Sequence, residues 1–233
     1  MTKKRIEIID GLRGLALILM VIQHALFDSV EFLHAPSWFF YNPVFESLHY
    51  VFAGLFVFLA GLSSQFSHSN IKRGIRAFAI AIAITIVTVI IKLPIWWGVL
   101  HLLGFCMIFY GLTRKAWDKI PRLVAPFVYT LLIVGSAIAV HDIKINVNFL
   151  WMFGWYQPTF TSADYFPIFP WLFVFLLGTW AGFYVVERKL PARFYDQHIP
   201  FFPAVGRHSL LIYVLHQPIL YGIVLLIPLI FHT

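Results

Sequence analysis

The stretch RIEIIDGLRGLALILMVIQHALFD (residues 5–28) decides the fold class. It opens with charged side chains, continues as an apolar run, and places His24 and Asp28 one helical turn apart inside that run. About 20 mostly apolar residues suffice to cross a hydrocarbon core of roughly 30 Å as a helix. The stretch therefore predicts a transmembrane helix that carries an imidazole and a carboxylate.

The composition of the whole chain agrees with this interpretation. Hydrophobic residues make up 61% and charged residues 12% of the 233 residues, and the mean hydropathy is +0.84. Soluble domains are about half apolar and about a quarter charged. We predict an all-α integral membrane protein with one transmembrane domain over residues 1–233, built as a bundle of about seven transmembrane helices. The expected helices span residues 12–33, 45–66, 75–91, 95–112, 123–140, 166–186 and 209–230.

The basic residues indicate the orientation of these helices. The formal net charge is +7, and fifteen of the 17 Lys and Arg residues fall on one side of the expected helices. The positive-inside rule explains this bias without a nucleic-acid partner. We expect a cytoplasmic N-terminus, an external C-terminus and a multi-pass protein of the plasma membrane. Its partner is the lipid bilayer, and its oligomeric state is open, with a homodimer as one option.

The longest expected connection is an external aromatic cap at residues 141–164. Two interpretations compete for its Trp, Tyr and Phe residues. Aromatic rings anchor proteins at a membrane interface, and they also stack on the flat faces of sugars at a binding mouth. The sequence leaves both open.

Ionisable side chains inside a transmembrane helix are costly and mark functional sites by default. His24, Asp28 and His101 fall in the outer half of the expected bundle, and we expect Asp28 to orient His24 as a base or nucleophile. The alternative is that these histidines only make hydrogen bonds that support helix packing. His216, in the last helix before Pro218, extends a polar path from Arg207 toward His24.

A second group of polar residues gathers at the expected cytoplasmic ends of the helices. Arginine offers paired donors to phosphate, so this group predicts a site for a phosphorylated molecule. The positive-inside bias alone also accounts for cations there. The residues concerned are Asp10, Arg13, Ser63, Arg73, Arg76, Arg207 and His208.

Five motifs, in order, carry a family resemblance: IDGLRGLALILMVIQH, FVFLAGLSS, GVLHLLG, SADYFPIFPWLFVFLLGTWAG and GRHSLLIYVLHQPIL. They resemble the transmembrane acyltransferases related to heparan-alpha-glucosaminide N-acetyltransferase, in a small bacterial branch formerly known as a domain of unknown function. The resemblance implies a multi-pass enzyme that moves an acetyl group from cytosolic acetyl-CoA to an amino sugar or glycan across the membrane.

The resemblance also suggests residue roles. The family's luminal histidine, a proposed acetyl carrier in a HASW stretch, matches His34 in HAPSW with one inserted residue. A buried family asparagine falls at His24, and the glutamine of GVLQRLG falls at His101. The expected catalytic residues are thus His24, Asp28, His34 and His101. Direct transfer and an acetyl-histidine route both stay open.

The sequence-based hypothesis is an acyl-CoA-dependent membrane acyltransferase that uses acetyl-CoA or another acyl-CoA as donor and needs no metal. The expected donor-binding residues are the whole cytoplasmic group together with His216, namely Asp10, Arg13, Ser63, Arg73, Arg76, Arg207, His208 and His216. The rival is a proton-coupled small-molecule transporter or channel, because buried His, Asp and Glu also form proton relays. A non-catalytic membrane scaffold is a third class.

Overall fold

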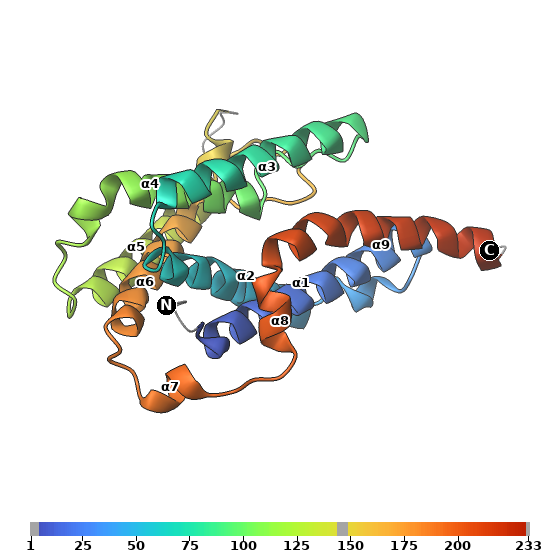
Figure 1. The fold of residues 1–233 in the computed structure, drawn as a ribbon. Coiled ribbons are helices and arrows are strands. Elements are labelled where there is room, and N and C mark those ends of the chain that lie inside the picture. Colours follow the sequence, from blue (N-terminus) through green and yellow to red (C-terminus); the bar gives the residue numbers. More distant parts are fainter. Residues whose placement is uncertain (1–4, 144–148, 232–233) are drawn as a thin grey trace. The chain divides into compact units, whose positions relative to one another are not determined.

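The computed structural model describes residues 5–143 and 149–231, with side chains through residue 227. Over these residues the chain is helical and contains no β-strand, which confirms the predicted all-α class. Figure 1 shows the helices in chain order. Their bounds are α1 Glu7–Leu33, η1 Ser37–Phe39, α2 Pro43–Ser64, α3 Asn70–Ile90, α4 Val99–Trp117, α5 Ala125–Asp142, η2 Trp151–Phe153, α6 Ile168–Val186, α7 Ala192–Asp196, α8 Phe202–Arg207 and α9 Ser209–Phe231.

Six segments of the described chain are long and apolar enough to cross a membrane, so the protein is a multi-pass membrane protein. They are Glu7–Leu33, Ser37–Ser64, Asn70–Ile90, Ala125–Asp142, Ile168–Val186 and Ser209–Ile227. The seventh expected span, residues 95–112, corresponds to α4. This helix begins later, at Val99, and its last turn carries Arg114 and Lys115, which shortens its apolar run.

The chain divides into two compact units. The first comprises Met1–Phe56 and Leu190–Thr233, and the second comprises Val57–Lys189. The boundary falls within α2, and each unit is described below by itself. The single domain expected over residues 1–233 stays a prediction.

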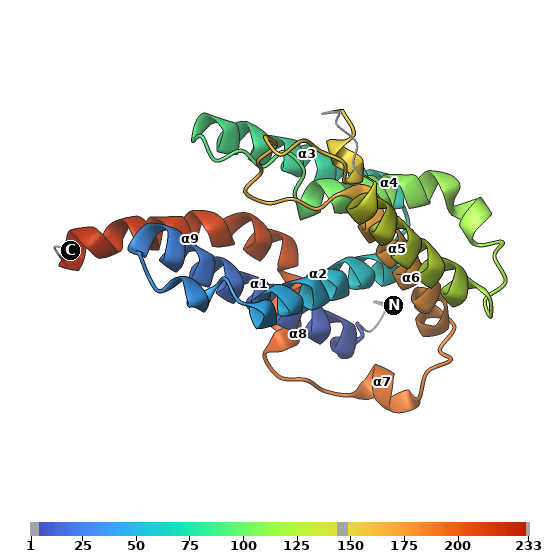
Figure 2. The ribbon, with the colours of Figure 1, turned by 180° about the vertical axis from the view of Figure 1, so that it is seen from behind.

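In the first unit, α1 packs against α8 and α9 (Figure 1, Figure 2). Two glycines permit the close approach of α1 and α8. A Cβ at Gly14 would lie 2.1 Å from the carbonyl oxygen of Phe202, and a Cβ at Gly206 would lie 1.8 Å from that of Asp10. Small residues at helix contacts are typical of membrane proteins, since they let backbones approach closely. This contact brings Arg207, the last residue of α8, to the first turns of α1.

In the second unit, α3 pairs with α4 and α5 pairs with α6. The α3–α4 pair also depends on glycine, because a Cβ at Gly74 would lie 2.7 Å from the carbonyl oxygen of Gly104. The buried core of this unit includes Leu102, Tyr110 and Phe175, whose side chains are inaccessible to solvent. The expected cap at 141–164 contains the short helix η2, while its residues 144–148 lie outside the described part of the chain.

Candidate functional site

Two histidines face each other between α1 and α9. The ring centroids of His24 and His216 lie 5.0 Å apart, with the ring planes inclined at 57°. His216 is buried, and its Nδ1 lies 2.6 Å from the carbonyl oxygen of Tyr213. A carbonyl oxygen can only accept, so Nδ1 of His216 carries a proton and donates it. In the neutral ring, Nε2 then holds the lone pair, and this buried atom has no hydrogen-bond partner among the described residues.

Asp28 lies one turn beyond His24 on α1 and is fully buried. Both of its carboxylate oxygens accept hydrogen bonds from Nε2 of Gln217, each at 3.0 Å. The partner of Asp28 in the structure is therefore an amide on α9, whereas the sequence led us to expect the imidazole of His24. These hydrogen bonds connect α1 to α9 next to the contact between the two imidazole rings.

His34 lies away from this pair, at the end of α1. It adopts a left-handed conformation with φ of 55° as the C-cap of the helix, and it is exposed. Ten residues separate it from His24, which corresponds to about 15 Å of helix rise. The structure thus does not bring His34 into contact with the imidazole pair.

His101 belongs to the second unit, where both ring nitrogens have local partners. The backbone N–H of Gly98 donates to Nδ1 at 3.2 Å, so Nε2 carries the proton and donates to Oγ1 of Thr85 at 3.2 Å. The ring of Trp97 stacks on the imidazole with centroids 5.6 Å apart. His101 thereby caps α4 and holds the turn that joins it to α3.

At the N-terminal end of α1, three arginine side chains lie close to the carboxylate of Asp10. Nη1 of Arg13 donates to its Oδ1 at 2.9 Å, while Arg5 and Arg207 approach its Oδ2 at 3.8 and 3.9 Å. The first contact is a hydrogen bond, and the other two are ion pairs beyond hydrogen-bond length. Arg13 therefore fixes Asp10, and Arg207 has N–H groups that a bound anion could use.

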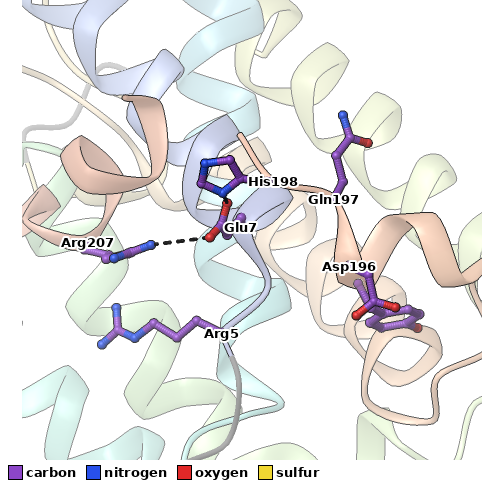
Figure 3. A pocket seen from close by; sticks show the side chains of 7 residues that line it. Arg5, Glu7, Asp196, Gln197, His198 and Arg207 are labelled. Carbon is purple, nitrogen blue, oxygen red and sulfur yellow. Dashed lines mark ion pairs between the residues drawn. The ribbon is translucent and has the colours of Figure 1, made fainter. Parts of the chain in front are cut away.

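Beside this cluster the structure contains a cavity of about 360 Å³. Figure 3 shows Arg5 and Arg207 with Glu7, whose carboxylate contacts Nδ1 of His198 at 3.0 Å and Arg207 at 4.0 Å. Glu7 also accepts a hydrogen bond from the backbone N–H of Ile199. The full lining is Arg5, Glu7, Tyr195, Asp196, Gln197, His198 and Arg207.

The other expected donor-binding residues lie outside this cavity. His208 is exposed, and its Nδ1 contacts the carbonyl oxygen of Ala204 at 2.9 Å. Ser63, Arg73 and Arg76 belong to the second unit. Ser63 donates to the carbonyl of Leu59 within α2, and both arginines are exposed on the first turns of α3. Of the expected group, the structure thus brings together Asp10, Arg13 and Arg207.

Sequence reasoning missed Gln217, Glu7 and His198. Gln217 follows His216 directly, and its polarity inside an apolar helix was the available signal. No local pattern pairs Glu7 with His198, which follows it by 191 residues and reaches it only through the connection between α7 and α8. No group of three or more His, Cys, Asp or Glu side chains that could hold a metal ion occurs in the described part of the chain.

The fold and the site define a multi-pass helical membrane protein with an imidazole pair between α1 and α9 and, at the N-terminal end of α1, a cavity lined by two arginines and two carboxylates. The family model described as "Heparan-alpha-glucosaminide N-acetyltransferase, catalytic" matches residues 5–218 of the chain. This protein therefore belongs to that family of transmembrane acetyltransferases. Comparisons with curated proteins and with solved structures find no match.

Proposed function

We propose that this protein is a membrane acyltransferase that moves an acyl group, with acetyl as the expected one, from cytosolic acyl-CoA to an amino sugar or glycan on the external side of the plasma membrane. The observation that carries the proposal is the pairing of His24 on α1 with His216 on α9. The first turn of α1 also borders the cavity. Membership of the acetyltransferase family supports the reaction class.

The cavity suits the phosphorylated end of the donor. Arg5 and Arg207 line it, and guanidinium groups bind phosphate through paired hydrogen bonds. From Asp10 to His24 the helix rises about 21 Å. An extended pantetheine arm separates the thioester of an acyl-CoA from its nucleotide phosphates by a comparable length. A donor held at the cavity can therefore present its acyl carbon near the imidazole pair.

The two histidines supply what acyl transfer to an amine needs. In the net reaction, the amine nitrogen bonds to the acyl carbon, the carbon–sulfur bond breaks, and the proton lost by nitrogen ends on the CoA sulfur. An imidazole can relay that proton as a general base, or it can carry the acyl group as a nucleophile. We assign this chemistry to the pair formed by His24 and His216. In the proposal Asp28 holds the two helices together, and His34 is a relay nearer the external face.

The remaining expected residues have supporting roles in the proposal. Asp10, held by Arg13, keeps Arg207 beside the first turns of α1. His101 positions the turn between α3 and α4 through its two hydrogen bonds. Ser63, Arg73, Arg76 and His208 are expected at the cytoplasmic ends of their helices. The excess of cations on one side of the helices supports a cytoplasmic N-terminus.

The test starts with purified protein in detergent and CoA or acetyl-CoA as the probe. A ligand that binds only the folded state at 100 times its Kd stabilises it by about 2.7 kcal/mol. Arg207→Ala should weaken this stabilisation and raise KM for acetyl-CoA. Arg193→Ala is the matched control, because Arg193 is an exposed arginine of α7 outside the cavity lining.

Acyl transfer is then measured with labelled acetyl-CoA and glucosamine. His24→Ala should abolish transfer while CoA still raises the thermal midpoint. A wild-type protein that neither responds to acyl-CoA nor transfers an acyl group would overturn the proposal. Proton-coupled flux of a small molecule into proteoliposomes in its place would identify a transporter.

A further inference from the structure

Within the part of the chain that the structure describes, two consecutive residues of α9 carry buried polar atoms without hydrogen-bond partners. These atoms are Nε2 of His216 and Oε1 of Gln217. Buried polar atoms are nearly always hydrogen-bonded, so each unpartnered one calls for an explanation, such as a catalytic role or a bound molecule. Both side chains are directed toward α1, since His216 contacts the ring of His24 and Gln217 contacts Asp28. The two unpartnered atoms therefore belong to adjacent side chains that both contact α1.

The local hydrogen bonds set what each atom can do. Donation from Nδ1 of His216 to Tyr213 leaves Nε2 as an acceptor. Donation from the amide nitrogen of Gln217 to Asp28 leaves its Oε1 as an acceptor too. A primary amine brings two N–H donors and matches this pair of acceptors. A hydroxyl group brings one donor and would leave one acceptor unpartnered.

The backbone next to these residues can yield to a substrate. Pro218 lacks the N–H that would bond to the carbonyl of residue 214, so α9 has a point of weakness directly after the two residues. A bend at this point would move α9 away from α1. The buried acceptors can thus become accessible to an amine.

We infer that Nε2 of His216 is the base that accepts the proton of the acceptor amine, and that Gln217 is a positioning residue that binds the amine's second N–H and fixes α9 to Asp28. This inference rests on the proposed function and places the base on α9, opposite His24. As the amine nitrogen bonds to the acyl carbon, one N–H proton moves to Nε2. The carbon–sulfur bond then breaks, and the same proton passes from Nε2 to the CoA sulfur.

The first test compares His216→Gln with the wild type at saturating acetyl-CoA and glucosamine. Glutamine keeps a polar side chain but cannot act as a base near neutral pH. We expect kcat to fall on the order of 10²–10⁴-fold, the usual contribution of a general base. We also expect the residual rate to rise with pH, because the deprotonated fraction of the amine grows, and the CoA-induced thermal shift to stay at the wild-type value. His68→Gln, at an exposed histidine of the second unit, is the control.

The second test addresses Gln217 through a double-mutant cycle with Asp28. Gln217→Ala should lower kcat at least tenfold, while KM for acetyl-CoA and the CoA-induced thermal shift stay unchanged. Because both residues act through one contact, Asp28→Ala combined with Gln217→Ala should cost less than the sum of the two single effects. A purely structural role would instead lower the thermal midpoint and leave the kcat of the folded fraction intact.

The outcomes separate the two proposals. A His216→Gln variant with a kcat close to that of the wild type overturns the inference and leaves the proposed function standing. Acyl label bound covalently to His216 in the absence of amine also overturns it, because the residue would then be a carrier. A wild-type protein without transfer or CoA response overturns the proposed function and the inference together.

Discussion

The carbonyl oxygen of Asp10 lies 1.8 Å from the position that a Cβ on residue 206 would occupy. The backbones of α1 and α8 therefore touch at Gly206, and this contact sets Arg207 beside Asp10. Gly206→Ala should force the two helices apart at a cost of about 1–3 kcal/mol, the usual cost of overpacking. Thermal unfolding in detergent measures the loss, and the CoA-induced stabilisation should weaken with it.

Gly222→Ala supplies the matched control for that prediction. Nothing lies within 4 Å of a Cβ at Gly222, which is in the interior of α9. Alanine is favoured over glycine within a helix by about 1 kcal/mol, so we expect unchanged or slightly increased stability. Equal losses in both variants would contradict the importance of the α1–α8 contact.

His101 offers a prediction that separates positioning from chemistry. Its ring accepts from Gly98 and donates to Thr85, so His101→Ala should destabilise the protein by about 1–3 kcal/mol through unsatisfied buried groups. Thr85→Val should produce part of the same loss. Thermal unfolding measures both variants. Loss of transfer with full stability in His101→Ala would instead assign the residue to the reaction itself.

Tyr110 makes a buried hydrogen-bonded link in the second unit. Its hydroxyl accepts from Nε2 of Gln65 at 2.7 Å and donates to Oδ1 of Asp118 at 3.0 Å. Tyr110→Phe leaves both partners short of a bond, and we expect a loss of about 1–3 kcal/mol in unfolding free energy. Chemical denaturation can measure this loss, and a change below about 0.5 kcal/mol would argue against the link.

Arg122 and Glu187 give the protein an acid-sensitive contact. The hydrogen bonds from Arg122, and to a smaller extent the contact with Lys189, lower the pKa of Glu187 to about 2 from its ordinary value of 4.5. A lowered folded pKa means that the contact stabilises the protein above about pH 4.5 and that this contribution disappears as the pH falls toward 2. Thermal midpoints of the wild type and Glu187→Gln should therefore converge in acid, and a growing difference would refute the assignment.

The sequence predicted the long helices well because each is an apolar run of membrane-spanning length. It did not predict α7 and α8, since short helices between spans have little periodic signal. The start of α4 was placed four residues early at Ile95, because hydropathy does not register the turn that His101 and Thr88 hold with hydrogen bonds. Local patterns mark where an apolar run exists, while side-chain contacts determine where its helix begins.

The candidate site was predictable in part. His24, Asp28 and His216 stood out because polar residues in apolar helices are costly, and the structure places all three between α1 and α9. Their pairing could not be derived, because it depends on the rotation of α9 about its axis. That rotation brings Gln217 to Asp28. His34 lies at the end of α1, because it is the C-cap of that helix. A rotation of α9 by one residue would place different side chains of α9 against His24 and Asp28.

The contact between Asp28 and Gln217 joins residues 189 positions apart in the sequence. During biosynthesis α1 is made before α9. The Gln217 amide, which donates to the buried Asp28 carboxylate of α1, emerges from the ribosome only when α9 is made. The contact between α1 and α9 therefore forms only after the intervening helices have been made, so a ribosome that stalls before α9 leaves behind an intermediate with an unmatched acidic group.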